Sequence, residues 1–470
     1  MMEKTELVTR LKEIAGEGNV FTGTETEPFL SEPRGRWTGK AAAVVRPGTT
    51  EEVAAILKIA SETGTPVVPQ GGNTGLVGGQ IPDMSGTAVI LSTARLNRIR
   101  DIDPDGNTIT VEAGVVLQAV QEAADAHDRL FPLSLGSQGS CQIGGNLSTN
   151  AGGTGALAHG VARDLCLGLE VVLPTGEILD DLNKLKKDNT GYNLRNLFIG
   201  AEGTLGVITA AVLKLFPKPA GRATAFVALP SPAEALALFA RARGEAGNGL
   251  TAFELMARIG VEFSVRHIEG VRDPLGEHHP WYVLMEISSG QSEEDARGKL
   301  EAVLEYGLED GLVLDAAIAE SYAQHADFWR LREGMSESQK PEGGSIKHDI
   351  SVPVDSVPDF LAEADKAVLA IEPGSRICAF GHLGDGNIHY NISQPVGADR
   401  KVFLQLAEVI TPAVHGIVRA HGGSISAEHG IGQMKRAELA ETKQPVALDL
   451  MRRIKKAFDP AGIMNPGKVL

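Results

Sequence analysis

The chain has 470 residues, more than one hydrophobic core usually organises, so we expect two or more domains. Its composition, 43% hydrophobic and 22% charged, is that of a globular protein, and its net charge of -16 argues against a nucleic-acid binder, which would need a basic surface for phosphates. Three separated cysteines without a CxxC pair indicate neither a zinc knuckle nor a disulfide framework, and favour a reducing compartment.

The amino-terminal residues predict a helix that ends at Gly16, because Leu7, Val8, Leu11 and Ile14 recur on one helical face. This segment has acidic residues and no long apolar run, so we expect neither a signal peptide nor a transit peptide. No stretch approaches the ~18 uninterrupted apolar residues of a transmembrane helix. We therefore expect a cytoplasmic protein, or one that is peripheral at the membrane.

Strands and helices alternate from residue 41 to the prolines Pro217 and Pro219, which cannot extend a strand and indicate a domain boundary. A helix is expected between a capping box at Thr49 and Glu52 and a stop at Gly64. The expected strands are 41–45, 67–68, 88–91, 108–113 and VITAAVLKLF.

Beyond this boundary the strand-like segments TAFVAL and WYVLMEISS precede helices expected at 232–243 and 293–306. A last long helix is expected at 402–420. Mixed strands and helices with long excursions predict an α+β domain built from ferredoxin-like βαβ halves. We place the domains at residues 1–217 and 218–425, with a carboxy-terminal segment at 426–470.

Two glycine-rich segments stand out in the first domain: residues 70–79, QGGNTGLVGG, and residues 136–155, GSQGSCQIGGNLSTNAGGTG. Glycine lets backbone N–H groups approach an anion closely, and neither segment contains Lys or Arg, so both favour a phosphate held by amides. Neither is a Walker A loop, and a GxGxxA match at 153–158 does not follow the buried strand that a Rossmann site requires. Tight turns in a glycine-rich fold are the competing interpretation.

These segments, with EGTLGVIT at 202–209 and NPGK at 465–468, resemble the FAD-binding family typified by vanillyl-alcohol oxidase and p-cresol methylhydroxylase. The resemblance implies an α+β fold, with a two-subdomain FAD-binding domain of the vanillyl-alcohol oxidase type and an α+β substrate or cap domain that has an antiparallel sheet. It implies that residues 426–470 return to the flavin site. Some members attach FAD through a histidine near the first loop, whereas Asn73 in that loop implies non-covalent FAD. The implied FAD-binding residues are Pro69, Gly71, Gly72, Asn73, Thr74, Gly75, Leu135, Gly136, Ser137, Gly139, Ser140, Gly144, Gly145, Ser148, Asn150, Gly152, Gly155, Glu202, Gly206, Val207, Ile208 and Asn465.

Residues 381–391, GHLGDGNIHYN, and 426–432, SAEHGIG, are the most chemically informative. A tight reversal at LGDGN would bring His382 and His389 together, and Glu428 would complete a two-histidine, one-carboxylate metal site. Three protein ligands leave positions open for a substrate, and His429 is then a candidate general base. The competing interpretation is a pair of structural histidines with Asp385 as a turn cap.

Both segments resemble the D-lactate, glycolate and D-2-hydroxyglutarate dehydrogenase branch of the same family. The resemblance implies that His382, His389 and Glu428 bind one divalent metal, with Zn expected first and Mn, Fe or Co as alternatives. It implies that His429 is the catalytic base in the oxidation of a D-2-hydroxy acid, with hydride transfer to flavin N5. No second redox motif is present, so we expect an external acceptor such as an electron-transfer flavoprotein or a quinone.

Residues 328–336 and 346–353 indicate the substrate, because they resemble the D-2-hydroxyglutarate dehydrogenases of this branch. There an Arg, a hydroxyl residue and a Lys bind the carboxylate distant from the metal. Arg332, Ser336 and Lys347 stand at the matching positions, with Ser336 where Thr is familiar, and Asn391 would contact the substrate near the metal. The expected reaction is D-2-hydroxyglutarate to 2-oxoglutarate, or oxidation of D-malate, in preference to D-lactate.

Three alternatives stay open. Within the family, the chain would be a D-lactate dehydrogenase. Outside it, a metal-dependent hydrolase would explain the histidines but leave the glycine segments without a ligand, and a non-catalytic flavin-binding protein would leave Glu428 and His429 structural. A homodimer also stays open, since nothing in the sequence sets the oligomeric state.

Overall fold

The computed structural model describes residues 3–470 and divides the chain into two compact units. The first unit comprises the residues up to Gly153, Gly160–Lys218 and Glu428–Leu470, and the second comprises Thr154–His159 and Pro219–Ala427. The divisions after residues 218 and 427 lie one and two residues from the predicted ones. The short segment Thr154–His159 groups with the second unit, although it lies inside the predicted first domain.

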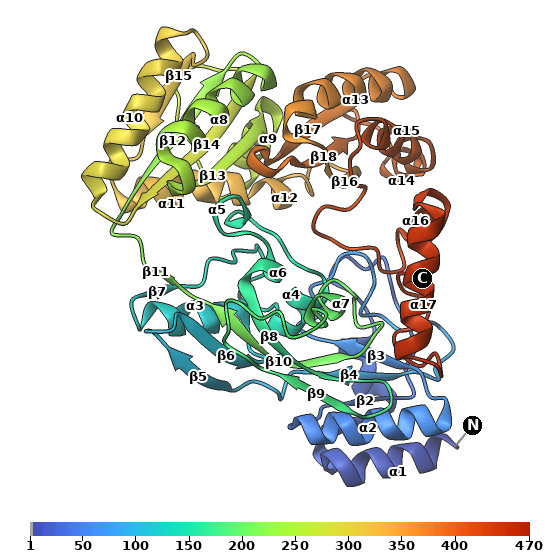
Figure 1. Ribbon diagram of the computed structural model, residues 1–470. Coiled ribbons are helices and arrows are strands. Elements are labelled where there is room, and N and C mark those ends of the chain that lie inside the picture. The colour runs from blue at the N-terminus through green and yellow to red at the C-terminus, as the bar shows by residue number, and fades with distance from the viewer. Residues whose placement is uncertain (1–2) are drawn as a thin grey trace. The chain divides into compact units, whose positions relative to one another are not determined.

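One sheet of the first unit has the strand order β1-β2-β4-β3, with β2, β4 and β3 parallel. Helices α1 and α2 share an apolar core with it and lie beside it in Figure 1. Thr49 caps α2 by accepting the Glu52 amide, and Gly64, at φ +67°, ends the helix, which confirms the predicted start and stop. The elements are α1 (Lys4–Ala15), α2 (Thr50–Thr63), β1 (Val20–Phe21), β2 (Ala43–Val45), β3 (Val67–Gln70) and β4 (Val89–Ser92).

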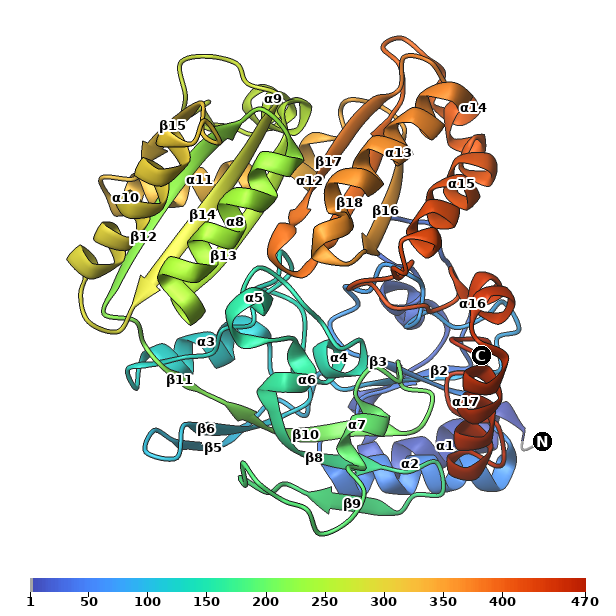
Figure 2. The same cartoon turned by 45° about the horizontal axis from the view of Figure 1, so that its top comes forward.

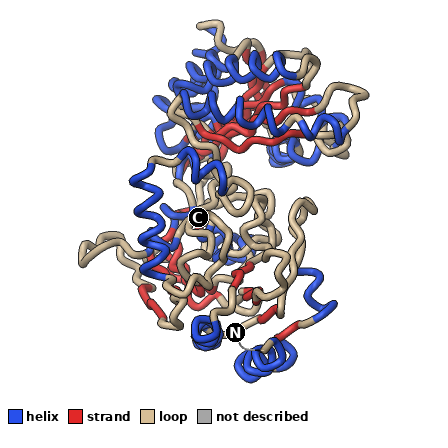
Figure 3. Tube along the Cα trace, turned by 90° about the vertical axis from the view of Figure 1, so that its right-hand side faces the viewer, coloured by secondary structure: helices blue, strands red, loops and turns tan. Residues whose placement is uncertain are grey.

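The other sheet of this unit is antiparallel, in the order β5-β6-β10-β8-β9, and has its own apolar core beneath α3 and α4. Two sheets with separate cores confirm the predicted two-subdomain arrangement, and much of this unit is loop, tan in Figure 3. Its strands are β5 (Ile99–Asp103), β6 (Thr108–Glu112), β8 (Cys166–Val172), β9 (Ile178–Asp181) and β10 (Val207–Lys214), with the short pair β7 (Arg129–Leu130) and β11 (Phe216–Pro217). Its helices are α3 (Leu117–Asp125), α4 (Ile143–Ser148), α6 (Ala162–Leu165), α7 (Arg195–Phe198), α16 (Arg436–Thr442) and α17 (Pro445–Phe458).

The second unit contains one seven-stranded antiparallel sheet in the order β15-β12-β14-β13-β17-β18-β16. Its first four strands in the chain have the ferredoxin-like sheet order β15-β12-β14-β13, with the additional helix α9 between β13 and β14, which confirms the predicted α+β cap fold. The strands are β12 (Gly221–Leu229), β13 (Leu250–Ala257), β14 (Trp281–Ser289), β15 (Asp315–Ile318), β16 (Ser345–Ser351), β17 (Arg376–His382) and β18 (Asn387–Ser393).

Helices cover both faces of this sheet. One face packs against α8, α10, α13 and α15, and Figure 2 shows α8, α10 and α13 on its near side. The other face packs against α9, α11 and α12 through Met256, Leu331, Met335 and Phe380. The helices are α5 (Ala156–His159), α8 (Pro232–Ala246), α9 (Arg258–His267), α10 (Glu293–Glu309), α11 (Tyr322–Glu333), α12 (Met335–Ser338), α13 (Val357–Ile371), α14 (Arg400–Gln405) and α15 (Ala407–Ala420). Short 3-10 helices complete the chain at η1 (Glu17–Asn19), η2 (Gly23–Phe29), η3 (Gly247–Gly249), η4 (Val354–Ser356) and η5 (Leu383–Asp385).

One predicted helix is divided in the structure. The segment expected as a single helix at 402–420 forms α14 and α15, with an interruption at Leu406. The amide of Leu406 donates to the carbonyl of Phe403, three residues back instead of four, so the last turn of α14 tightens and ends there. Helical periodicity continues through such a turn, which is why the sequence pattern does not reveal it.

Candidate functional site

The predicted metal and substrate residues of the second unit share one face of its sheet. Lys347 of β16 pairs in register with Asn391 of β18, and His389 of β18 pairs with Phe380 of β17. Register partners face the same way and side chains alternate along a strand, so these residues and His382, two beyond Phe380, lie on the face that α11 and α12 cover. Arg332 and Ser336 come from α11 and α12 themselves.

The predicted reversal at LGDGN is present and brings the two histidines together. The β17–β18 hairpin turns through η5, where the Asp385 carboxylate accepts the Asn387 amide at 3.0 Å. The ring centroids of His382 and His389 are 5.9 Å apart, in an edge-to-face arrangement. Burial raises the pKa of Asp385, opposed by the neighbouring His382. The turn-cap role of Asp385 is therefore compatible with the paired histidines.

A glutamate that the sequence analysis missed links two of these residues. The carboxylate of Glu254, in β13, has Oε1 2.7 Å from His382 Nδ1 and Oε2 2.6 Å from Arg332 Nη2. Only 1% of Glu254 is exposed, and His382 and Arg332 are also buried. Its one sequence signal is an acidic residue within the otherwise apolar strand FELMA, where a carboxylate must have a partner.

The predicted carboxylate-binding residues lie close to one another. The Nζ of Lys347 donates to the Ser336 backbone carbonyl at 3.3 Å, and Ser336 is four residues beyond Arg332. The Arg332 guanidinium lies over the Phe380 ring, 4.9 Å from its centroid. Its Nε is buried and has no hydrogen-bond partner among residues 3–470. A buried donor of this kind suits an anionic ligand, because an unpaired buried N–H is costly.

Asp349 is a second residue that the sequence analysis did not select. It is the register partner of His389, it is buried, and one of its carboxylate oxygens lies within 4.8 Å of a ring nitrogen of that histidine. The side-chain amide of Asn387 donates to Asp349 Oδ1 at 3.1 Å. Strand alternation from Lys347 would have placed Asp349 on the same face, so the signal was present in KHD.

Glu428 and His429 begin the segment that returns to the first unit. Their ligand atoms lie within 4.8 Å of one another, and the Glu428 carboxylate accepts the Gly153 amide at 2.6 Å, in the second glycine segment. The preceding residue, Ala427, belongs to the second unit and donates its amide to the Asp349 carbonyl at 3.4 Å. One peptide bond therefore joins Glu428 to a residue that is hydrogen-bonded beside His389.

The two glycine segments meet inside the first unit. A Cβ at Gly72 would overlap the Ser140 carbonyl, so only glycine allows this approach. Gln142 also connects the segments, since its Oε1 accepts from Thr93 at 2.7 Å and the Gln70 carbonyl accepts the Thr93 amide at 3.0 Å. The predicted loop residues from Pro69 to Gly152 are thus assembled in one unit, whereas Gly155 lies in Thr154–His159 of the second.

Glu202 and Asn465 join this assembly from two further segments. The Glu202 amide donates to the Ser148 carbonyl at 2.8 Å, and its carboxylate accepts the amides of Ile431 and Gly432 at 2.7 and 2.8 Å. Burial raises the pKa of Glu202, although these amides oppose the change. Asn465 donates to the carbonyls of Gly79 and Glu202. The predicted residues 206–208 lie four to six positions after Glu202, where β10 begins.

The backbone of this assembly adopts conformations that are rare for residues with a side chain. Seven non-glycine residues among 3–470 have positive φ, and four of them, Asn73, Asn150, Glu202 and Asn465, are predicted FAD-binding residues. Such conformations concentrate at functional sites. The buried Oδ1 atoms of Asn73 and Asn465 have no hydrogen-bond partner within the described residues. Cation-free loops with spare polar atoms fit the polar groups of a dinucleotide.

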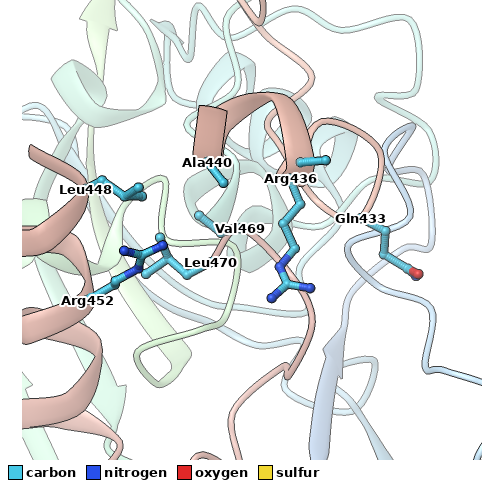
Figure 4. Close-up of a pocket in the computed structure, with 8 residues that line it drawn as sticks. Gln433, Arg436, Ala440, Leu448, Arg452, Val469 and Leu470 are labelled. Atoms are coloured by element: carbon cyan, nitrogen blue, oxygen red, sulfur yellow. The ribbon is translucent and has the colours of Figure 1, made fainter. Parts of the chain in front are cut away.

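A separate cavity of about 290 Å³ lies in the first unit beside α16 and α17. Arg436, Arg452 and Leu470 are among the residues that line it, as Figure 4 shows. Its lining contains none of the predicted site residues, so it is distinct from the candidate site.

Comparisons with known protein families cover both units. Residues 41–181 match a family described as FAD binding domain, and residues 218–469 match the family described as FAD linked oxidases, C-terminal domain. The second match alone spans more than half of the chain. None of the helices within residues 3–470 combines the length and apolar character that crossing a membrane requires.

Whole-chain relatives agree with these matches. The chain is 39% identical over 464 residues to the mitochondrial D-2-hydroxyglutarate dehydrogenase of Arabidopsis thaliana, covering 98% of this chain and 81% of that protein. It is 38% identical over 450 residues to a D-2-hydroxyglutarate dehydrogenase of Xanthomonas citri pv. viticola, covering 95% and 93%. Among solved structures, substrate-bound p-cresol methylhydroxylase superposes with a TM-score of 0.78 at 18% identity, covering 99% and 96%, which confirms the predicted fold.

Proposed function

Since this chain belongs to the FAD-linked oxidases and is an FAD-dependent oxidoreductase, we propose that it oxidises D-2-hydroxyglutarate to 2-oxoglutarate. One structural observation carries the substrate assignment: Lys347 and Arg332 lie on the same sheet face as the histidine pair His382 and His389. A substrate with a carboxylate at each end suits a surface that offers cations beside imidazoles. Two relatives, from Arabidopsis thaliana and Xanthomonas citri pv. viticola, are named D-2-hydroxyglutarate dehydrogenases, which supports this choice.

The flavin site of the proposal is the assembly of glycine segments in the first unit. Backbone amides of the loops around Gly71–Gly75 and Gly136–Gly152 hold the pyrophosphate, and Asn73 leaves the cofactor dissociable. The unpartnered Oδ1 atoms of Asn73 and Asn465 are acceptors, so they suit hydroxyl or N–H donors of the cofactor and not its phosphate oxygens. Glu202 fixes the segment that follows His429 through the Ile431 and Gly432 amides.

The metal site of the proposal uses His382, His389 and Glu428. The Nδ1 of His382 faces Glu254, so Nε2 is the ring nitrogen that would bind a metal, and a carboxylate behind a ligating histidine is the usual supporting arrangement. Glu428 directly follows Ala427, whose amide donates to the carbonyl of Asp349, the register partner of His389. Nitrogen and carboxylate donors suit Zn, with Mn, Fe or Co as alternatives.

FAD would supply the acceptor for a hydride from the substrate carbon, and a divalent ion held by His382, His389 and Glu428 would supply the positive charge that lowers the pKa of the substrate hydroxyl. His429 removes the hydroxyl proton as general base. Arg332, Ser336 and Lys347 bind the distant carboxylate, and Asn391, beside Lys347 in the sheet, contacts the substrate on the metal side. The electrons leave to an external acceptor, an electron-transfer flavoprotein or a quinone.

Replacing Lys347 tests the substrate assignment. Lys347→Met removes one cation of the proposed carboxylate site. Loss of its partly buried charge pair with the substrate should cost about 2 kcal/mol of binding free energy, which corresponds to a roughly 30-fold fall in kcat/KM for D-2-hydroxyglutarate. D-lactate, which has no second carboxylate, should lose much less. Lys340→Met is the matched control, because Lys340 is an exposed lysine seven residues before Lys347 that forms an ion pair with the exposed Glu337. Equal losses on both acids, or a wild type that prefers D-lactate, would replace this proposal with a D-lactate dehydrogenase.

The metal assignment has its own experiment. Chelation should abolish turnover while the flavin absorbance spectrum stays unchanged, because the metal and pyrophosphate residues belong to different segments. His389→Ala should lose stoichiometric metal by elemental analysis. His429→Ala should keep the metal but reduce flavin at least roughly 100-fold more slowly, as expected when a general base is lost. Full metal content and full rate in His389→Ala would refute the ligand set.

A further inference from the structure

The carboxylate of Glu254 touches two residues that the proposed function places in different parts of the site. One oxygen lies 2.7 Å from the imidazole of His382, a proposed metal ligand, and the other lies 2.6 Å from the guanidinium of Arg332, a proposed substrate-carboxylate residue. We propose that Glu254 is a positioning residue that orients His382 for the metal and Arg332 for the substrate through a single carboxylate. This inference rests on the proposed function.

The location of Glu254 gives the first argument. It lies in β13, in the interior of a seven-stranded sheet, between Phe253 and Leu255, which are both buried in apolar cores. Burying a carboxylate is costly, and replacing a buried ion pair with apolar residues is often neutral or stabilising. A side chain that only filled this space would therefore not need a charge. The two short contacts with site residues supply a reason for one.

The atoms that Glu254 contacts give the second argument. An ionised carboxylate accepts hydrogen bonds but cannot donate them. In the hydrogen bond between Glu254 and His382, the proton therefore lies on Nδ1 of His382. A neutral imidazole protonated at Nδ1 carries its lone pair on Nε2, and this is the tautomer that binds a metal through Nε2. Glu254 therefore selects both the tautomer and the ring orientation of His382.

Strand pairing makes this arrangement rigid. Glu254 and His382 are register partners across β13 and β17, so their backbones are fixed relative to one another. Arg332 is held on its other side by the ring of Phe380, two residues before His382 on the same strand. Because one carboxylate serves both residues, a change at Glu254 should disturb metal binding and substrate binding together.

The test compares Glu254→Gln with a matched glutamate of the same sheet. Glu286, on β14, is buried and accepts from Trp329 and Thr251 instead of from site residues, so Glu286→Gln makes the same chemical change away from the site. The primary readout is the Zn²⁺ affinity of the metal-depleted full-length flavoprotein, measured by competition with a chromophoric chelator. Loss of a carboxylate behind a metal-binding histidine typically lowers metal affinity 10- to 100-fold, so we expect this loss in Glu254→Gln and a change below 2-fold in Glu286→Gln.

Substrate binding gives the second readout. At saturating Zn²⁺, Glu254→Gln should still raise the KM for D-2-hydroxyglutarate, because Arg332 loses its partner, while Glu286→Gln should not. Glu254→Asp keeps the charge but shortens the side chain, so its Zn²⁺ affinity should fall between wild type and Glu254→Gln. This variant also carries the test if Glu254→Gln does not fold.

The outcomes separate the inference from the proposed function. A wild type that binds Zn²⁺ and oxidises the substrate, with Glu254→Gln or Glu254→Asp of unchanged Zn²⁺ affinity, overturns the positioning role alone. Equal losses in Glu254→Gln and Glu286→Gln also overturn it, because they would reflect a general weakening of the sheet. A wild type that binds no divalent metal overturns the proposed metal site and this inference together.

Discussion

The substitution Gly145→Ala should weaken FAD binding at the proposed flavin site without disturbing the fold of that site. Gly145 lies in the short helix α4 of the second glycine segment, and an added Cβ would meet no atom of the protein within 4 Å. Alanine in place of glycine in a helix is worth at most about 1 kcal/mol of stability, so the apoprotein should be unchanged or slightly more stable. If the pyrophosphate approaches these amides, the new methyl group occupies the space that it needs.

The size of the effect follows from one displaced contact. A hydrogen bond between a backbone amide and a charged phosphate contributes about 1.5 to 3 kcal/mol, so its loss should raise the Kd for FAD roughly 10- to 150-fold. Gly244→Ala is the matched control, because Gly244 lies in α8 of the second unit and its Cβ would also meet nothing within 4 Å. Fluorescence titration of the apoproteins with FAD measures the Kd, and thermal unfolding checks the fold. A Gly145→Ala protein that binds FAD as tightly as Gly244→Ala would refute the placement of the pyrophosphate.

Three further predictions concern the whole chain. Acid precipitation should release all flavin to the supernatant, because Asn73 stands in the first loop, and flavin in the washed pellet would contradict non-covalent attachment. The three cysteines are free and buried, and burial raises the pKa of Cys166 and of Cys378 to about 12. A thiol reagent at neutral pH should therefore react slowly with the native protein and should label three thiols after unfolding. Rapid labelling of the native protein would contradict this. Burial alone would raise the pKa of Glu342, but hydrogen bonds from Arg376, His267 and Arg266 hold it at about 2, below its usual 4.5. Its ionised form therefore stabilises the fold above pH 4.5, and this stabilisation is lost as the pH falls toward 2. Glu342→Gln should lower the unfolding temperature at pH 7, and its unfolding temperature should approach that of wild type in acid. A difference in unfolding temperature that does not change with pH would refute the assignment.

Local patterns in the sequence were enough for the features that depend on near neighbours. The cap and stop of α2 and the hairpin that pairs His382 with His389 both follow from turn chemistry. The family resemblance supplied the roles of these residues, which spacing alone left open.

Features that depend on distant strand pairing could not be read from the sequence. Glu254 reaches His382 across 128 positions in the chain, and no local pattern fixes which residue of β13 lies opposite β17. Similarly, the grouping of Thr154–His159 with the second unit depends on tertiary packing. Asp349 is different, because alternation from Lys347 already placed it on the site face.

The most direct test is anaerobic mixing of the purified flavoprotein with single hydroxy acids while the flavin absorbance is followed. The proposed function predicts rapid bleaching by D-2-hydroxyglutarate, little by its L-enantiomer, and slower bleaching by D-lactate. Bleaching that is absent with D-2-hydroxyglutarate, or faster with D-lactate, would contradict it.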